Sequence, residues 1–99
     1  MKKQFMIELT LPSVFTEDLL ARIPAQRMTI NKMMEKGKIV SYALSDDRTR
    51  LWIITNAESE FDAMEMIADF PIIDFIEHST CHPLMFHNMV SMLMPISLN

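Results

Sequence analysis

The pattern of hydrophobic and polar positions divides this chain into four short strand-like segments and two longer helix-like ones. The first strand-like segment covers residues 4–11, and its apolar side is formed by Phe5, Ile7, Leu9 and Leu11. A period of two is typical of a strand that buries one face. Glu8 lies on the opposite face of this predicted strand, and Pro12 ends it.

The first helix-like segment lies between Thr16 and Gly37. Thr16 is a typical N-cap followed by two acidic residues, and Lys36 with Gly37 is a typical helix end. Apolar residues recur between these ends at helical spacing: Leu19, Leu20, Ile23, Ile30, Met33 and Met34. Pro24 removes one backbone donor inside the segment, which predicts either a kink or a main helix that starts at Pro24.

Two further strands and a second helix follow. Residues 39–44 and 51–55 predict strands, and the turn between them contains no glycine, so it is longer than the tightest hairpin loop. Ser59 is a typical N-cap for a helix that runs to about residue 69. Pro71 closes this helix.

Residues 74–82 predict the fourth strand, with Ile76, His78, Thr80 and His82 on one face. The order is therefore βαββαβ, the ferredoxin-like arrangement of the α+β class, in which two helices cover one face of a four-stranded antiparallel sheet. Two such sheets packed through their open faces would form a dimeric α+β barrel. The alternative is a monomer whose open face is capped by residues 86–99.

Composition favours the oligomer. The 99 residues indicate one domain, yet 49% of them are apolar, which is more than one small core needs. Eleven methionines are typical of adaptable contacts, although a Met-rich core is the alternative. We assign residues 1–88 to the domain and 89–99 to a Met-rich tail that docks at an interface. The expected partner is the chain itself, as a homodimer or a larger homo-oligomer.

Charge, the length of the apolar stretches and cysteine content limit the partners and the location that we expect. The net charge is -4 and no basic cluster follows Lys2-Lys3, so we expect no nucleic-acid partner. The apolar stretches are shorter than the roughly 18 residues of a membrane span, so we expect no membrane partner either. One cysteine cannot form an intramolecular disulfide, which is consistent with a cytoplasmic location.

Several short motifs occur in an order that points to a known family. Lys36-Gly37 closes the first helix, and Ser59 opens the second at a set interval from Pro71. Cys81 shortly precedes a His-Pro-x-x-x-His ending at 82–87. In these features, and in an opening strand that ends near a proline, the chain resembles the muconolactone isomerase family over residues 4–88. That family has the dimeric α+β barrel fold.

The resemblance implies a small isomerase that moves a double bond in a lactone acid by proton transfer, without a metal or an organic cofactor. The chain departs from the family at two places. Acidic Glu8 stands at a strand position that is basic in the family, and residues 37–43 are plainer than the family's second strand, which is rich in Trp, His and Arg. These are pocket-like positions, so the sequence leaves the substrate open.

Proton transfer needs a group that takes up and returns a proton, and something that stabilises an enolate-like charge. Glu8, His82 and His78 are the catalytic candidates. If Glu8 faces a barrel interior, burial raises its pKa; the alternative is a solvated face or a pair with an arginine. The alternative for both histidines is a hydrogen-bonded structural role.

Substrate-binding candidates are Arg27, as the cation for a substrate carboxylate, together with Tyr42 and Trp52. A solvated Arg27 on the helix surface is the alternative. The histidines and Cys81 lack the spacing of a zinc site, so we expect no metal. Cys81 has no base on its own face and is a weak candidate nucleophile.

Three classes of function remain open from the sequence. The first is the isomerase, favoured by a pocket that holds Glu8 or His82 beside an arginine. The second is a non-catalytic binding or structural homologue of the same fold. The third is a cofactor-independent monooxygenase, favoured by a deep aromatic-lined pocket without a cation.

Overall fold

Alternating residues of the first segment form a central strand, β1 (Lys3–Thr10), in the computed structural model, which describes residues 2–89. It pairs antiparallel with β3 (Arg50–Ala57) on one side and β4 (His78–Pro83) on the other. β2 (Ile39–Leu44) pairs with the outer edge of β3, so the sheet order is β2-β3-β1-β4. The two central strands, β1 and β3, hold most of the buried strand residues, as expected for strands with neighbours on both sides.

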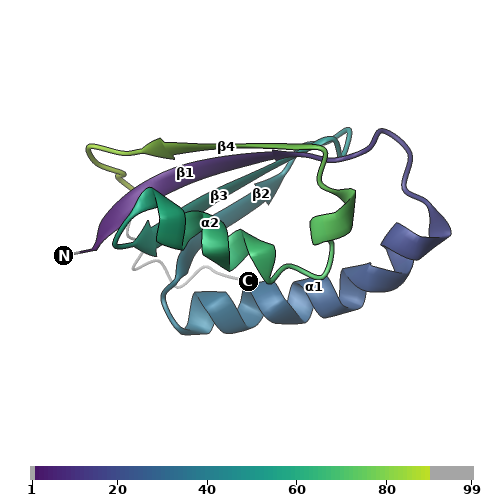
Figure 1. Ribbon diagram of the computed structural model, residues 1–99, viewed down its shortest axis with the longest axis horizontal. Helices are drawn as coiled ribbons and strands as arrows, with labels where there is room; N and C mark the ends of the chain where they lie inside the picture. Colours follow the sequence, from purple (N-terminus) through teal and green to yellow (C-terminus); the bar gives the residue numbers. More distant parts are fainter. Residues whose placement is uncertain (1, 90–99) are drawn as a thin grey trace, which may run out of the picture.

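Two helices lie together on one face of this sheet (Figure 1). α1 (Glu17–Glu35) begins where the Thr16 side chain accepts a hydrogen bond from Leu19 N, at 3.3 Å. α2 (Glu60–Ala68) begins in the same way, with the Ser59 side chain accepting from Asp62 N at 3.1 Å. Both predicted N-caps are confirmed, and the order and layers confirm the predicted ferredoxin-like α+β fold.

α1 continues through Pro24 as one helix, so a separate main helix starting at Pro24 is not formed. In Figure 1 the first part of α1 lies at an angle to the rest of the helix. A proline inside a helix lacks one backbone donor and crowds the preceding turn, which accounts for a bend of this kind. α1 ends at Glu35 with Lys36 as its C-cap, and the predicted stop Gly37 follows with a φ of +76°, in the left-handed region that glycine adopts without a steric cost.

The fourth strand starts later than the sequence predicts. Residues Ile73–Phe75 form a 3-10 turn, in which Phe75 N donates to Ile72 O and Ile76 N donates to Ile73 O. Sheet pairing begins only with Glu77 N, which donates to Thr10 O, and the strand proper begins at His78. The prediction of a strand from residue 74 is wrong because apolar residues at 75 and 76 serve a turn as well as a strand.

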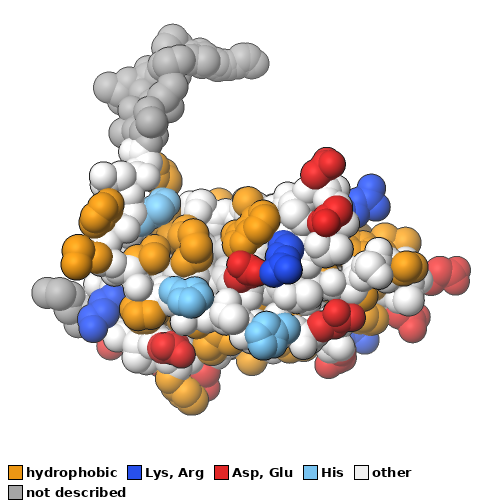
Figure 2. Space-filling view, turned by 90° about the horizontal axis from the view of Figure 1, so that it is seen from above, with side chains coloured by type: hydrophobic (Ala, Val, Ile, Leu, Met, Phe, Trp, Pro, Cys, Tyr) orange, Lys and Arg blue, Asp and Glu red, His pale blue; other side chains and the backbone are white. Residues whose placement is uncertain are grey.

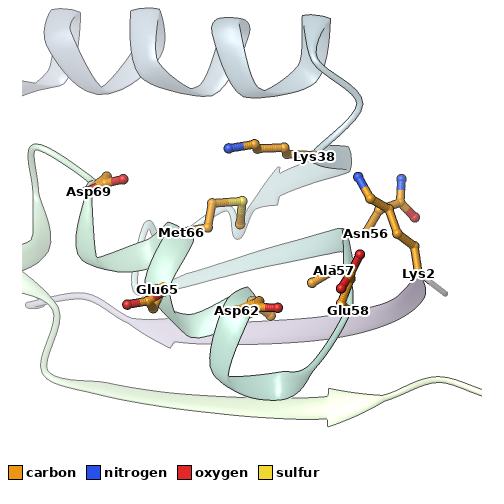
Figure 3. Close-up of a pocket in the computed structure, with 10 residues that line it drawn as sticks. Lys2, Lys38, Asn56, Ala57, Glu58, Asp62, Glu65, Met66 and Asp69 are labelled. Atoms are coloured by element: carbon orange, nitrogen blue, oxygen red, sulfur yellow. The ribbon is translucent and has the colours of Figure 1, made fainter.

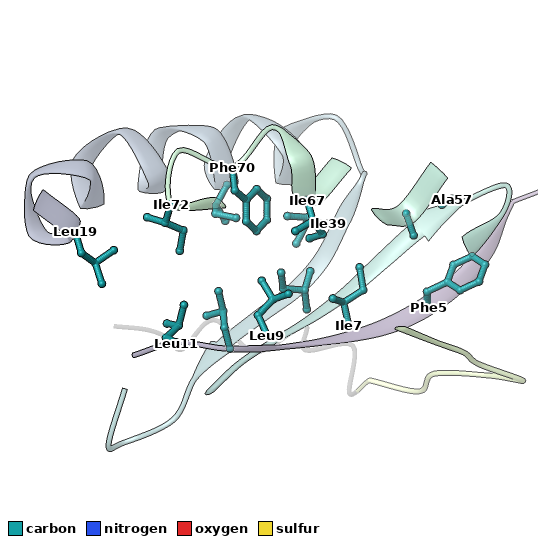
Figure 4. Close-up of a cluster of buried hydrophobic side chains, with 14 residues drawn as sticks. Phe5, Ile7, Leu9, Leu11, Leu19, Ile39, Ala57, Ile67, Phe70 and Ile72 are labelled. Atoms are coloured by element: carbon teal, nitrogen blue, oxygen red, sulfur yellow. The ribbon is translucent and has the colours of Figure 1, made fainter. Parts of the chain in front are cut away.

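The core fills the space between the sheet and the helices (Figure 4). Phe5, Ile7 and Leu9 point from β1 toward the helices, as the period of two predicts. Phe70 and Ile72 enter the core from the segment after α2. The residues that alternate with these apolar positions therefore lie on the other side of the sheet.

No helix within residues 2–89 covers the other side of the sheet. Figure 2 views this open face, where hydrophobic side chains gather between histidines and a central pair of opposite charges. Met6, which lies on it, is 38% exposed. Residues 90–99 of the predicted interface tail lie outside the described residues. Within residues 2–89, no helix is both long and apolar enough to cross a membrane.

The turn between β2 and β3 is organised by one carboxylate. Asp47 Oδ1 accepts from Thr49 Oγ1 at 2.7 Å, from Thr49 N at 3.0 Å and from Ser45 Oγ at 2.8 Å. These bonds, those from Thr49 first, lower the pKa of Asp47 to about 2. Arg48 has a φ of 66°, so this turn reaches without glycine a conformation that glycine usually supplies.

Candidate functional site

The predicted catalytic residues lie on the open face of the sheet. The Glu8 carboxylate on β1 accepts hydrogen bonds from the Arg50 guanidinium and, at 3.1 Å, from Trp52 Nε1, both on β3. Glu8 and Trp52 are direct partners in the sheet register, so their side chains leave the sheet on the same side. Two side chains of β3 thus donate hydrogen bonds to one carboxylate of β1.

These donors decide the ionisation of Glu8. The hydrogen bond from Arg50 and then that from Trp52 lower the pKa of the Glu8 carboxyl, and they outweigh the opposing effect of burial. The expected rise in this pKa depends on Glu8 facing a barrel interior, which one chain does not form, so it stays a prediction. Its stated alternative, a pair with an arginine, is what the structure contains. A carboxylate held ionised in this way is a poor group for taking up a proton near neutral pH.

His78 and His82 lie on the same open face. In the register between β1 and β4, His78 faces Thr10, Thr80 faces Glu8 and His82 faces Met6. His82 also contributes a small electrostatic lowering of the Glu8 pKa. The prediction of a shared face is confirmed for His78, Thr80 and His82, and no described element covers them. It is wrong for Ile76, which precedes β4 and packs against the core.

A second group of candidates lies on the helix side of the sheet, around a cavity of about 230 Å³. The cavity lies between α1 and the ends of β2 and β3. Most of its lining is apolar: Leu11, Phe15, Leu19, Ile23, Leu44, Leu51 and Ile72. Figure 4 shows Leu11, Leu19 and Ile72 facing one another at this end of the core. The polar part of the lining comes from Gln26, Arg27 and Tyr42.

Gln26 is a polar residue in an apolar place. It is only 2% exposed, and its Oε1 accepts a hydrogen bond from Ile72 N at 3.3 Å. Its Nε2 has no hydrogen-bond partner within the described chain. A buried amide donor without a partner costs roughly 1–3 kcal/mol, so a group that accepts from Nε2 would be stabilised here.

Tyr42 and Arg27 lie beside Gln26. Burial raises the pKa of the Tyr42 phenol, against smaller opposing effects of Gln26 and Arg27. The phenol therefore remains protonated at neutral pH and can donate a hydrogen bond. The Gln26 amide approaches the phenol from α1 without completing a hydrogen bond to it. Arg27 is exposed and makes no salt bridge within residues 2–89.

The structure thus divides the predicted site residues between two faces. Arg27 and Tyr42 are brought together at the cavity, whereas Glu8, His78, His82 and Trp52 lie on the opposite side of the sheet. In the described part of the chain the sheet separates Glu8 and His82 from Arg27, so these residues do not share a pocket of one chain. Cys81 faces the helices, where burial and then the charge of Glu60 raise the pKa of its thiol.

Sequence reasoning missed Gln26. In the sequence, Gln26 is an ordinary helix residue between Ala25 and Arg27, and nothing distinguishes it from a solvated glutamine. One signal was present: seven residues separate Gln26 from Leu19, which places both on the same side of the helix as the apolar positions.

A wider hollow of about 340 Å³ lies between the ends of the two helices (Figure 3). Asp62 and Glu65 reach it from α2 and Asp69 from the residue that follows α2, and Lys38 and Lys2 border it from other segments. These charged residues are all exposed. Mixed, solvated charges around an open hollow are typical of an ordinary surface, so this hollow is a weaker candidate than the apolar cavity.

Comparisons with known proteins support the fold and go no further. No protein-family model matches the chain, and no curated protein matches it. Two crystal structures of a protein from Agrobacterium tumefaciens resemble it, with TM-scores of 0.53 and 0.51 and sequence identities of 20% and 18%. They cover 85% and 83% of this chain and 91% and 86% of their own.

One of the two structures is described as a NIPSNAP-family protein with unknown function. At this level of identity the similarity shows a shared fold alone. The ferredoxin-like α+β fold therefore has independent support, whereas membership of the muconolactone isomerase family has none from these comparisons.

Proposed function

We propose that this protein binds a small, largely apolar organic molecule in the cavity between α1 and the sheet. The observation that carries the proposal is the lining: a continuous apolar wall that meets three polar side chains at one place. Ligand sites in proteins have this composition, with a mostly apolar wall and a few polar groups that fix orientation.

The size of the cavity limits the ligand. At about 230 Å³ the cavity is smaller than the pockets that hold drug-sized molecules. An apolar cavity of about 150 Å³ accommodates benzene. A single aromatic ring with a short side chain, or an aliphatic molecule of similar size, therefore fits this site.

Binding is a better proposal than the isomerisation that the resemblance implies. An isomerase needs a proton-transferring group beside the bound substrate. Glu8, His78 and His82 do not line the cavity, and Arg50 and Trp52 lower the pKa of Glu8. Turnover of muconolactone, followed by ultraviolet absorbance, would reverse this preference. The monooxygenase alternative called for a pocket without a cation, whereas Arg27 borders this one.

The test is a thermal melt with 3-phenylpropanol, a neutral probe of the right size. We expect the wild type to melt at a higher temperature with the probe, because binding to the folded state alone stabilises it. Ile23→Phe fills part of the cavity, so this variant should gain about 0.5–2 kcal/mol of stability and lose its response to the probe.

Ile73→Phe is the matched control. Ile73 is 37% exposed in the 3-10 turn and does not line the cavity, so this variant should respond to the probe as the wild type does. If the probe stabilises Ile23→Phe as much as the wild type, or stabilises neither, the cavity is not a binding site.

A further inference from the structure

The polar groups at the cavity have one chemical property in common: each of them offers a hydrogen-bond donor. Gln26 contributes its amide Nε2, Tyr42 its phenol and Arg27 its guanidinium. Among the lining residues no carboxylate is present to accept from them. A site with several donors and no carboxylate favours a ligand whose polar end is an acceptor, and an anion above all.

The orientation of the Gln26 amide follows from its neighbour. The oxygen and nitrogen of a glutamine side chain are exchanged by a half-turn, so the choice between them depends on the surroundings. Ile72 N is a donor, and Gln26 Oε1 is the acceptor that satisfies it. In the exchanged orientation Nε2, a donor, would face Ile72 N, which is also a donor. The Nε2 group is therefore the part of the amide that does not bond to Ile72.

The arrangement of the three donors also determines where the polar end and the apolar end of the ligand lie. Gln26 and Arg27 are consecutive residues of α1, with Gln26 buried and Arg27 exposed. Tyr42 reaches the same place from β2 and lies on the helix side of the sheet, opposite Ile53 in the register. A polar group held here has one buried donor and one solvated positive charge, while the rest of the ligand lies along the aliphatic wall.

We propose that the ligand of this cavity is a small monocarboxylic acid, aromatic or aliphatic. Its carboxylate lies against Gln26 Nε2, the Tyr42 hydroxyl and the Arg27 guanidinium, and its apolar body lies against Leu19, Leu51 and Ile72. This inference rests on the proposed function, because it names the ligand class of the same cavity. It excludes amines and other cationic ligands, whose charge would be repelled by Arg27.

The experiment compares two ligands of nearly identical shape by isothermal titration calorimetry at pH 7. 3-Phenylpropionate carries the carboxylate, and 3-phenylpropanamide replaces it with a neutral amide. We expect the acid to bind the wild type about tenfold more tightly or better, the ratio expected for one charge-assisted hydrogen bond. The neutral amide reports how well the apolar wall binds without the charge.

Two variants remove the donors separately. Arg27→Gln removes the positive charge at the cavity, and the preference for the acid should fall to about threefold or less. Gln26→Glu keeps an oxygen for Ile72 N and replaces the free donor with an acceptor, so it should weaken binding of the acid more than tenfold. Circular dichroism and a thermal melt of each variant establish that it is folded.

Arg22→Gln is the matched control on the same helix. Arg22 pairs with Asp74 at 3.1 Å and does not line the cavity, so the same loss of charge should leave the preference within twofold of wild type. Equal binding of acid and amide by the wild type, or a preference unchanged in both cavity variants, overturns the inference while the proposed binding function stands. If neither ligand nor 3-phenylpropanol binds, the proposed function itself fails.

Discussion

Leu19 and Leu9 are both fully buried leucines of one core, but only Leu19 lines the cavity. Leu19 is 1% exposed and Leu9 is 0% exposed, so truncation to alanine removes the same atoms from equally buried positions. Leu9 is surrounded by packed atoms of the sheet and helices. Part of the Leu19 side chain faces the cavity instead, and that part has fewer packed neighbours to lose.

The two substitutions should therefore differ in cost. Truncation of a buried leucine to alanine costs about 2–5 kcal/mol, according to how much of the lost volume was well packed. We expect Leu9→Ala in the upper half of that range and Leu19→Ala in the lower half, a difference of about 1–2 kcal/mol. In a domain of this size such a difference separates the melting temperatures by about 4–16 °C.

The assay is urea denaturation with and without 3-phenylpropanol. Leu19→Ala enlarges the proposed binding site, so a saturating ligand should restore part of its lost stability, by about 2.7 kcal/mol at one hundred times the dissociation constant. Binding sites remain intact in Leu9→Ala, which should gain as much as wild type and no more. Equal costs for both variants, or no ligand-dependent gain in Leu19→Ala, would refute the reasoning.

Three further predictions concern other parts of the molecule. Thr55 is fully buried and its Oγ1 has no partner within residues 2–89, so Thr55→Val should raise the free energy of unfolding in urea by about 1 kcal/mol; a loss of stability would show that the hydroxyl is needed. The folded pKa of Asp47 is about 2, below its ordinary 3.8, so its stabilisation is complete above about pH 4 and is lost as the pH falls toward 2. Asp47→Asn should therefore approach wild-type stability over that interval, and a gap that persists to pH 2 would contradict the prediction. We also propose that a second copy of the chain covers the open sheet face. Light scattering should then give a dimer for the wild type and a monomer for Met6→Glu, because this substitution places a second acid beside Glu8. A wild-type monomer at micromolar concentration would contradict the proposal.

The fold was predictable from the sequence wherever the periodicity of apolar residues and the residues typical of strand or helix ends indicated the same element. The period of two in residues 4–11 identified both the strand and its buried face, because burial on one side of a sheet requires that alternation. Thr16, Gly37 and Ser59 identified helix ends through backbone hydrogen bonding that does not depend on distant contacts.

The start of β4 could not be predicted in the same way. The apolar residues before His78 fit a strand locally, and only the position of Thr10, whose carbonyl accepts from Glu77 N, decides where pairing begins. Such long-range pairing is absent from any local pattern.

The candidate site was only partly predictable, since its chemistry depends on which face each residue occupies. Arg27 and Tyr42 were identified as binding residues by their chemistry, and the fold places them at one cavity. For Glu8 the sequence offers an arginine pair only as an alternative and does not identify the donors, because Arg50 and Trp52 lie more than forty residues away in the chain. Gln26 became a candidate only when its burial and its unpartnered amide were visible together.

The most direct test of the central claim is a methyl-resolved nuclear magnetic resonance titration of the wild-type protein with 3-phenylpropanol. The account predicts chemical-shift changes confined to methyl groups around the cavity, those of Leu19, Ile23 and Ile72 above all. The methyl groups of Ile54, on the open face, should keep their positions. Shifts concentrated at Ile54 and Met6, or no shifts at millimolar probe, would contradict the claim that the cavity between α1 and the sheet binds a small apolar molecule.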